Sequence, residues 1–211
     1  MTSIWGPMGW MTLHSMASLY SDNPSPSEKQ LMTTWLDMFR DTITCPHCKE
    51  HFGDMLSAYK ARFPLLLSSR KELLLFTFRA HNAVNRRLSK PLYHTLADCT
   101  RILNTNFAVT PAATFRSAYI VHIRRYWRTM RDASGIAMLK KIIEMAKIEQ
   151  EYASPRGLGN FTELGEETVI LPGNVLEKPG EEQPSPIRIM ARNFTGGGGM
   201  VMTPGGLRFR R

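Results

Sequence analysis

Apolar side chains recur at helical spacing through the first 153 residues, and this pattern constrains the fold more than any other feature. Apolar residues three or four positions apart share one face of an α-helix, and that face needs a partner to bury it. Ser, Pro and Gly separate the stretches, as is usual between helices. We therefore expect an all-α fold, with helices over residues 9–20, 28–43, 45–63, 69–89, 93–104, 113–132 and 135–153.

Local signals refine the expected helix ends. Ser27 is a suitable N-cap for the second helix, and Pro46 suits the first turn of the third. The sequence between residues 104 and 112 is expected to be a loop. The sixth helix is expected to bury a stripe of apolar side chains, namely Ile120, Ile123, Trp127 and Met130.

Residues 154–211 differ from the helical part, because Gly and Pro are scattered through them and helical periodicity is absent. Such a segment buries too little apolar surface to offset the entropy lost on ordering. We expect a low-complexity, largely disordered tail here, following an additional helical segment at 105–153. Two short apolar stretches, 168–171 and 187–190, could pair as strands or dock on a partner.

Several classes of protein are disfavoured by composition. No run of about 18 apolar residues occurs, so no membrane span is expected. The N-terminal residues lack the basic and apolar regions of a signal peptide. Three cysteines in 211 residues exclude an extracellular disulfide scaffold.

The net charge of +9 lies mainly in the helical part, because residues 153–211 carry seven Lys/Arg and six Asp/Glu. A basic surface attracts anions of any kind, including nucleic acid and acidic proteins. Arg124, Arg128 and Arg131 line one face of the sixth expected helix, where they could grip phosphates. A solvated helix face is the commoner reason for such a row.

The segment CPHC holds two of the three cysteines, Cys45 and Cys48. A zinc site needs four ligands, and His51 could supply a third, with Cys99, His47, His81 or His94 as the fourth. No second CxxC motif exists to complete such a site. Two reduced thiols packed in a helix are a further alternative.

Redox chemistry is favoured over these two alternatives. Cysteines at this spacing can close a small disulfide ring, and a helix N-terminus stabilises the thiolate form. Such thiols exchange readily with substrate thiols. An all-helical setting argues against a thioredoxin fold, which would need a βαβ pattern.

Three blocks in order carry a resemblance to a known family: WGPMGWMTLHSMA at residues 5–17, CPHC at 45–48, and HNAVNRRLSKP at 81–91. Together they resemble the Erv/ALR family of FAD-dependent sulfhydryl oxidases. The resemblance covers about residues 4–104, and it implies a domain at 1–104 that binds FAD. The implied fold is a four-helix bundle with a short fifth helix.

The resemblance also implies roles for individual residues. Two sets of side chains would hold FAD. The set against the flavin would be Gly6, Trp10 and His14. The set against the adenine and phosphates would be His81, Asn82, Asn85, Leu88 and Lys90. Without the resemblance, Trp10 and His14 would pass for core residues, and His81 and Asn85 for a surface pair one helical turn apart.

The implied activity is disulfide formation in protein thiol substrates. Cys45 would exchange with a substrate dithiol, and Cys48 would pass electrons to FAD. O2 would reoxidise the flavin and yield H2O2. Family members usually form homodimers, and a thioredoxin-like protein could relay electrons from the substrate.

The chain departs from the family at two places. Cys99 has no partner for the structural disulfide of many cellular members, so it is expected to be a buried free thiol. Ile102 stands where the family has a tryptophan, for which Trp127 or Tyr126 could compensate. No further cysteine pair is present to act as a shuttle.

In these departures the chain resembles the short family members of large DNA viruses. The resemblance implies that it acts in the host cytoplasm and the virion. The mitochondrial intermembrane space is the less favoured setting. The alternative function is a non-catalytic basic helical protein, associated with a virion or nucleic acid, with a small metal site at the CxxC.

Overall fold

Seven α-helices and no strand form the regular structure of the described residues, which are 2–153, 164–173 and 175–176 of this computed structural model. The helices are α1 (Thr2–Ser18), α2 (Pro26–Thr42), α3 (Pro46–Arg62), α4 (Arg70–Arg87), α5 (Leu96–Val109), α6 (Ala112–Trp127) and α7 (Ala133–Ala153). The expectation of an all-α fold is confirmed. In the part of the chain described, no helix combines the length and apolarity needed to cross a bilayer.

Capping side chains set most helix starts. Ser25, not Ser27, is the N-cap of α2, since its hydroxyl accepts from Glu28 N and Pro26 occupies the first turn. Ser69 and Thr95 cap α4 and α5 in the same way. A hydroxyl in this role satisfies a backbone N–H that the helix itself leaves without a partner.

The expected loop at 104–112 is wrong, because α5 continues through it to Val109. Leu103 and Phe107 are both buried, so the apolar face of α5 extends one turn further than the sequence suggested. The opposite error occurs in α6, which ends at Trp127. Met130 therefore lies beyond the helix and is partly exposed, outside the buried stripe.

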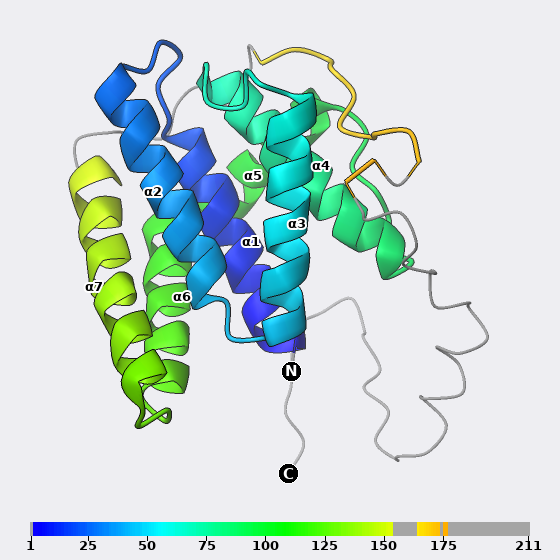
Figure 1. Cartoon of the computed structure of the whole chain (residues 1–211). Helices are drawn as coiled ribbons and strands as arrows, with labels where there is room; N and C mark the ends of the chain where they lie inside the picture. Colours follow the sequence, from blue (N-terminus) through cyan, green and yellow to red (C-terminus); the bar gives the residue numbers. More distant parts are fainter. Residues whose placement is uncertain (1, 154–163, 174, 177–211) are drawn as a thin grey trace, which may run out of the picture. The chain divides into compact units, whose positions relative to one another are not determined.

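The core lies between helices that are distant in sequence. α1 packs against α4 and α6, while α2 packs against α3 and α7 (Figure 1). Large aromatic side chains fill the centre and are almost completely inaccessible; they are Trp35, Tyr59, Phe76, Phe78 and Tyr119. Each removes roughly 150–250 Å² of surface from water, which makes this cluster the main source of stability.

The helical pair α6–α7 is part of this core. Tyr119 of α6 stacks on Phe39 of α2 with 5.3 Å between ring centroids. Ile142 and Met145 of α7 are completely buried. The pair therefore packs on the same bundle that carries the CxxC motif.

Residues 164–173 dock on the chain itself. Thr168 forms an isolated bridge with Thr95, and Leu96 N donates to Glu167 O at 2.9 Å. Val169 is completely buried. The rest of the expected tail, including the stretch at 187–190, lies outside the described residues.

Glu149 of α7 is a carboxyl group inside the core. Its side chain is 5% exposed, and its Oε1 accepts a hydrogen bond from Trp35 Nε1 at 3.1 Å. Burial raises its pKa to about 7, although the Trp35 hydrogen bond and Arg116 act in the opposite direction.

This raised pKa predicts how stability depends on pH. Between pH 4.5 and about 7 the unfolded chain loses the Glu149 proton while the folded chain keeps it, so stability falls as pH rises. Glu149→Gln keeps an acceptor for Trp35 and should be more stable than wild type at pH 8, by up to about 3 kcal/mol. The gain should vanish near pH 4.5.

Urea unfolding at several pH values measures the difference. The matched control is Glu144→Gln, since Glu144 is exposed on the same helix. An equal effect of the two substitutions at pH 8 would contradict the assigned cause.

Candidate redox site

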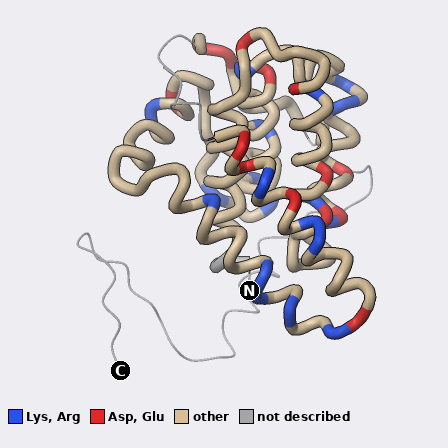
Figure 2. Tube along the Cα trace, turned by 90° about the vertical axis from the view of Figure 1, so that its left-hand side faces the viewer, with Lys and Arg blue, Asp and Glu red and all other residues tan. Residues whose placement is uncertain are grey.

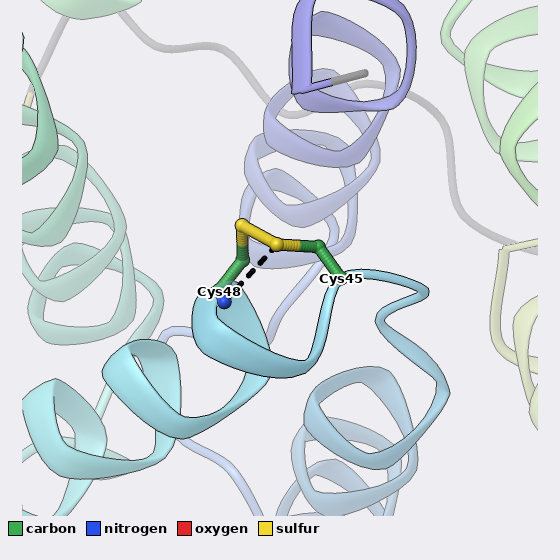
Figure 3. Close-up of a disulfide and its surroundings, with 2 residues drawn as sticks. All are labelled: Cys45 and Cys48. Atoms are coloured by element: carbon green, nitrogen blue, oxygen red, sulfur yellow. Dashed lines mark hydrogen bonds between the residues drawn. A yellow bond between two sulfur atoms is a disulfide. The ribbon is translucent and has the colours of Figure 1, made fainter.

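Cys45 and Cys48 form a disulfide at the start of α3, with their Cα atoms 5.2 Å apart (Figure 3). Cys45 is the N-cap of the helix, and its Sγ accepts from the Cys48 backbone N–H at 3.3 Å. Both residues are partly exposed. When the bond is reduced, this N–H and the helix dipole favour negative charge on the Cys45 sulfur.

In the disulfide form, neither cysteine sulfur is available as a thiolate ligand for a metal. Across residues 2–153 and the described part of 164–176, no group of three or more His, Cys, Asp or Glu side chains is placed to hold an ion. His51 is buried within the bundle, and His47 is exposed beside the disulfide.

Aromatic rings from α1 and α4 form a flat stack. The rings of Trp10 and His81 lie 4.2 Å apart and within 5° of parallel. His14 stacks on Phe78 with 4.0 Å between centroids. Trp10 keeps an exposed part, so this stack offers a planar apolar wall to a ligand.

A directed chain of hydrogen bonds sets the tautomers of the two histidines. The Thr77 hydroxyl donates to Leu74 O at 2.9 Å, so it accepts from His14 Nδ1 at 3.0 Å. A neutral His14 then accepts at Nε2 from His81 Nδ1, again at 3.0 Å. The remaining nitrogen of His81, Nε2, is left as an acceptor.

Both histidines are held neutral. Burial, together with the smaller effect of the charge of Lys90, lowers the pKa of His81 to about 3. Burial, followed by repulsion from His81, places the pKa of His14 well below its ordinary value. Burial penalises the charged form of an imidazole, and this keeps the hydrogen-bond chain intact.

Gly6 lies one helical turn before Trp10 and has open space around it. A Cβ added there would meet nothing within 4 Å, whereas one at Gly9 would touch the Trp5 ring at 3.3 Å. Packing within the described structure therefore explains Gly9 but not Gly6. The space beside Gly6 and Trp10 suits a planar group approaching the backbone of α1.

The two predicted asparagines are engaged with backbone. Asn82 exchanges hydrogen bonds with Tyr93 N and O, both at 2.9 Å, and also donates to Val169 O at 3.1 Å. Asn85 donates to Pro91 O at 3.2 Å. Their contact with a cofactor stays a prediction, but both hold the loop that follows α4.

That loop carries the two remaining predicted residues. Leu88 is half exposed and Lys90 is exposed. The influence of Lys90 on His81 shows that its charge lies near the ring stack. Lys90 is thus available to an anionic group bound at the stack.

The disulfide lies beside the helix that carries Trp10, because α3 begins beside the first turns of α1 (Figure 1). Figure 3 likewise shows α1 behind the disulfide.

Sequence reasoning missed the role of Thr77 and the backbone partners of Arg86. Thr77 sets the His14 tautomer, and its position one helical turn before His81 was the available signal. Arg86 donates to the carbonyls of Leu171 and Gly173, which belong to a segment far away in sequence. No local pattern could have indicated that contact.

The chain departs from the family pattern at Cys99 and Ile102, and the structure shows a different environment for each. Cys99 is completely buried and unpaired, as expected, and burial raises its pKa to about 12. Ile102 is partly exposed on α5. Trp127 is not a substitute beside it, because its indole N–H donates to Thr42 O at 2.9 Å, at the end of α2.

Comparison with known proteins identifies relatives. The model of the Erv1 / Alr family matches residues 7–108. A protein of Invertebrate iridescent virus 3 is 39% identical over 88 residues, which cover 42% of this chain and 58% of that protein. The FAD-linked sulfhydryl oxidase of African swine fever virus (isolate Tick/Malawi/Lil 20-1/1983) is 35% identical over 88 residues, covering 42% of this chain and 71% of the viral protein. The FAD-linked sulfhydryl oxidase ERV2 of Saccharomyces cerevisiae is 29% identical over 98 residues, covering 46% of each chain.

Because both histidines are neutral in the folded chain, we expect the free energy of unfolding to fall at acid pH. As pH falls below 6.5 the unfolded chain binds protons that folded His81 refuses until about pH 3, so stability falls with pH. Between pH 7.5 and 5 this site alone should cost about 2 kcal/mol. His81→Phe keeps a ring against Trp10 and should remove that part of the pH dependence.

Chemical denaturation of both proteins across this pH range measures the change in slope, independently of any change in baseline stability. His94→Gln serves as the control, since His94 is exposed. If His81→Phe keeps the full wild-type slope, the assignment to His81 is wrong.

Proposed function

The chain belongs to the Erv1/Alr family, and from this premise we propose that it is an FAD-linked thiol oxidase that forms disulfides in other proteins. The observation that carries the proposal is the position of the Cys45–Cys48 disulfide. It lies at the N-terminus of α3, partly exposed, beside α1, the helix that contributes Trp10 to the Trp10–His81 stack.

The residues present fit a flavin cofactor. Trp10 and His81 offer a flat wall, Gly6 leaves open space beside it, and His81 Nε2 is available as an acceptor. Lys90 supplies positive charge for phosphates. We assign Gly6, Trp10 and His81 to direct contact with the cofactor, while His14, which is buried, orients His81 through its hydrogen bond. Asn82, Asn85 and Leu88 would complete the site through the loop that holds Lys90.

The disulfide exchanges with a substrate dithiol in two steps. A substrate thiolate attacks Cys45 Sγ, a new S–S bond forms, and Cys48 Sγ leaves with the electron pair. The second substrate thiolate then attacks its partner sulfur and releases Cys45. The substrate is oxidised by two electrons, and the Cys45–Cys48 pair is reduced by two. The Cys48 N–H that donates to Cys45 Sγ stabilises the charge on Cys45 as it leaves.

FAD, when bound, would supply the acceptor that returns the pair to its disulfide form and passes the electrons to O2, giving H2O2. The chain's own contribution is the placement of Cys48 in the first turn of α3, where the helix start favours a thiolate.

The partners and setting follow from the same proposal. The substrates would be protein thiols, either directly or through a thioredoxin-like relay, and the chain would act as a homodimer. Because no further cysteine pair exists within these 211 residues, we favour the viral setting of host cytoplasm and virion over the mitochondrial intermembrane space.

The first test of this function is the cofactor itself. The purified chain should show the visible absorbance of bound flavin, and Trp10→Ala should weaken FAD binding about tenfold through loss of ring stacking. Trp10→Phe should retain most of the affinity. A colourless chain that fails to bind added FAD would sink the proposal.

The second test separates the cysteines. In the flavin-loaded chain, Cys45→Ala or Cys48→Ala should reduce oxygen uptake with dithiothreitol by about 10³-fold or more, because the exchanging sulfur is lost. Cys99→Ala is the matched control and should retain activity, since Cys99 is buried and unpaired. Uptake that survives in both motif variants would exclude the proposed exchange.

A further inference from the structure

The turn between α6 and α7 concentrates positive charge. Residues 124–141 contain six basic side chains (Arg124, Arg125, Arg128, Arg131, Lys140 and Lys141) and one acidic one (Asp132), so their net charge is +5. In Figure 2 this turn is the lowest part of the described tube, and basic residues gather along it. We call the four arginines the basic turn.

The charge of the basic turn is not neutralised within the described residues. Arg125, Arg128 and Arg131 are exposed, Arg124 is partly exposed, and none of them forms an ion pair with another described residue. Lys141 differs, because it pairs with Asp41. Four guanidinium groups are thus left to bind an external anion.

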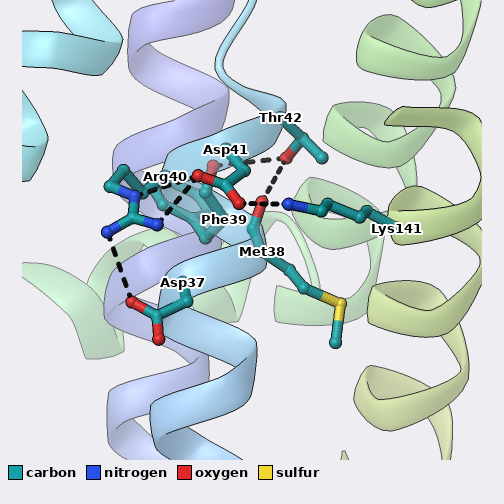
Figure 4. A network of polar contacts seen from close by, with 7 residues as sticks. All are labelled: Asp37, Met38, Phe39, Arg40, Asp41, Thr42 and Lys141. Carbon is teal, nitrogen blue, oxygen red and sulfur yellow. Dashed lines mark hydrogen bonds and ion pairs between the residues drawn. The ribbon is translucent and has the colours of Figure 1, made fainter. Parts of the chain in front are cut away.

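Specific contacts tie this turn to the redox site. Trp127 Nε1 donates to Thr42 O at 2.9 Å, and Thr42 lies three residues before Cys45. Lys141 of α7 pairs with Asp41, which also binds Arg40 (Figure 4). Thr42 and the next residue, Ile43, are buried, so the segment leading to Cys45 is held on both sides.

Two arginines lie next to Trp127 in the last turn of α6. Arg124 lies one helical turn before Trp127, and Arg128 is the C-cap residue that follows it. Because Trp127 contacts the end of α2, the part of α6 that carries these two arginines lies beside the segment that leads to Cys45.

We propose that the basic turn is a docking surface for substrate proteins with acidic residues near their dithiol. This inference rests on the proposed thiol oxidase function and assigns a substrate class to the same site. Guanidinium groups bind carboxylates in a two-pronged geometry, and complementary charge speeds encounter. Nucleic acid is the other large anion that could bind the basic turn, but it carries no thiol to present to the neighbouring disulfide.

The experiment uses flavin-loaded full-length chain and three dithiol peptides that differ only in flanking residues: Asp/Glu, Ser or Lys/Arg. At low salt, kcat/KM for the acidic peptide should exceed that of the basic peptide by about tenfold or more, mainly through KM. The difference should disappear in about 0.5 M NaCl, where exposed charges are strongly screened.

Charge reversal locates the effect. Arg124→Glu with Arg128→Glu should remove the preference for the acidic peptide, while Arg124→Lys with Arg128→Lys should keep most of it. Lys60→Glu with Arg62→Glu is the matched control, since both residues are exposed in the last turn of α3, away from Cys45. Dithiothreitol is uncharged, and its oxidation should be the same in all of these variants.

The outcomes separate this inference from the proposed function. Equal kcat/KM for the three peptides, with dithiothreitol oxidised normally, overturns the docking surface alone. Absence of dithiothreitol oxidation overturns the oxidase function and the docking surface with it. A third outcome is that wild type binds a single-stranded oligonucleotide, Arg124→Glu with Arg128→Glu abolishes this binding, and no peptide is preferred. That outcome reassigns the basic turn to nucleic acid.

Discussion

The burial of α1 on nearly its whole circumference is the constraint on which the rest of the structure depends. Every residue from 12 to 20 is buried. A helix enclosed in this way must satisfy its polar side chains by contacts with its neighbours. His14 contacts Thr77 of α4, Ser15 accepts from Arg116 of α6, and Thr12 donates to the carbonyl of Phe115. These contacts set how α4 and α6 lie against α1.

The proposed chemistry depends on this arrangement, because it needs both the Cys45–Cys48 pair and the ring stack. α1 and α4 bring Trp10 against His81, while α2 delivers the CxxC segment to the start of α3. The α6–α7 pair then holds the end of α2 through Trp127 and Lys141. Helices beyond the matched family region thus hold the end of α2, which leads to Cys45 in the family domain.

Sequence patterns predicted some features well for a physical reason. The positions of Trp10, His14 and His81 follow from helical spacing and the ordered motifs, and the structure brings all three together. The ends of α5 and α2 were wrong, because burial of Phe107 extends one helix and Ser25 rather than Ser27 caps the other. Asn82 and Asn85 came from the resemblance, but their backbone partners at Tyr93, Val169 and Pro91 were not foreseeable.

The sequence by itself determined the all-α class, the placement of Cys45 and Cys48 three residues apart at a helix start, and the order of the three motifs. These features are local, since they depend on periodicity, caps and a three-residue spacing. Only the tertiary structure decided that residues 164–173 dock on α4, that Glu149 is buried against Trp35, and that the basic turn lies beside the redox segment. Such contacts join residues about 85 or more positions apart, and the packing of whole helix faces selects them.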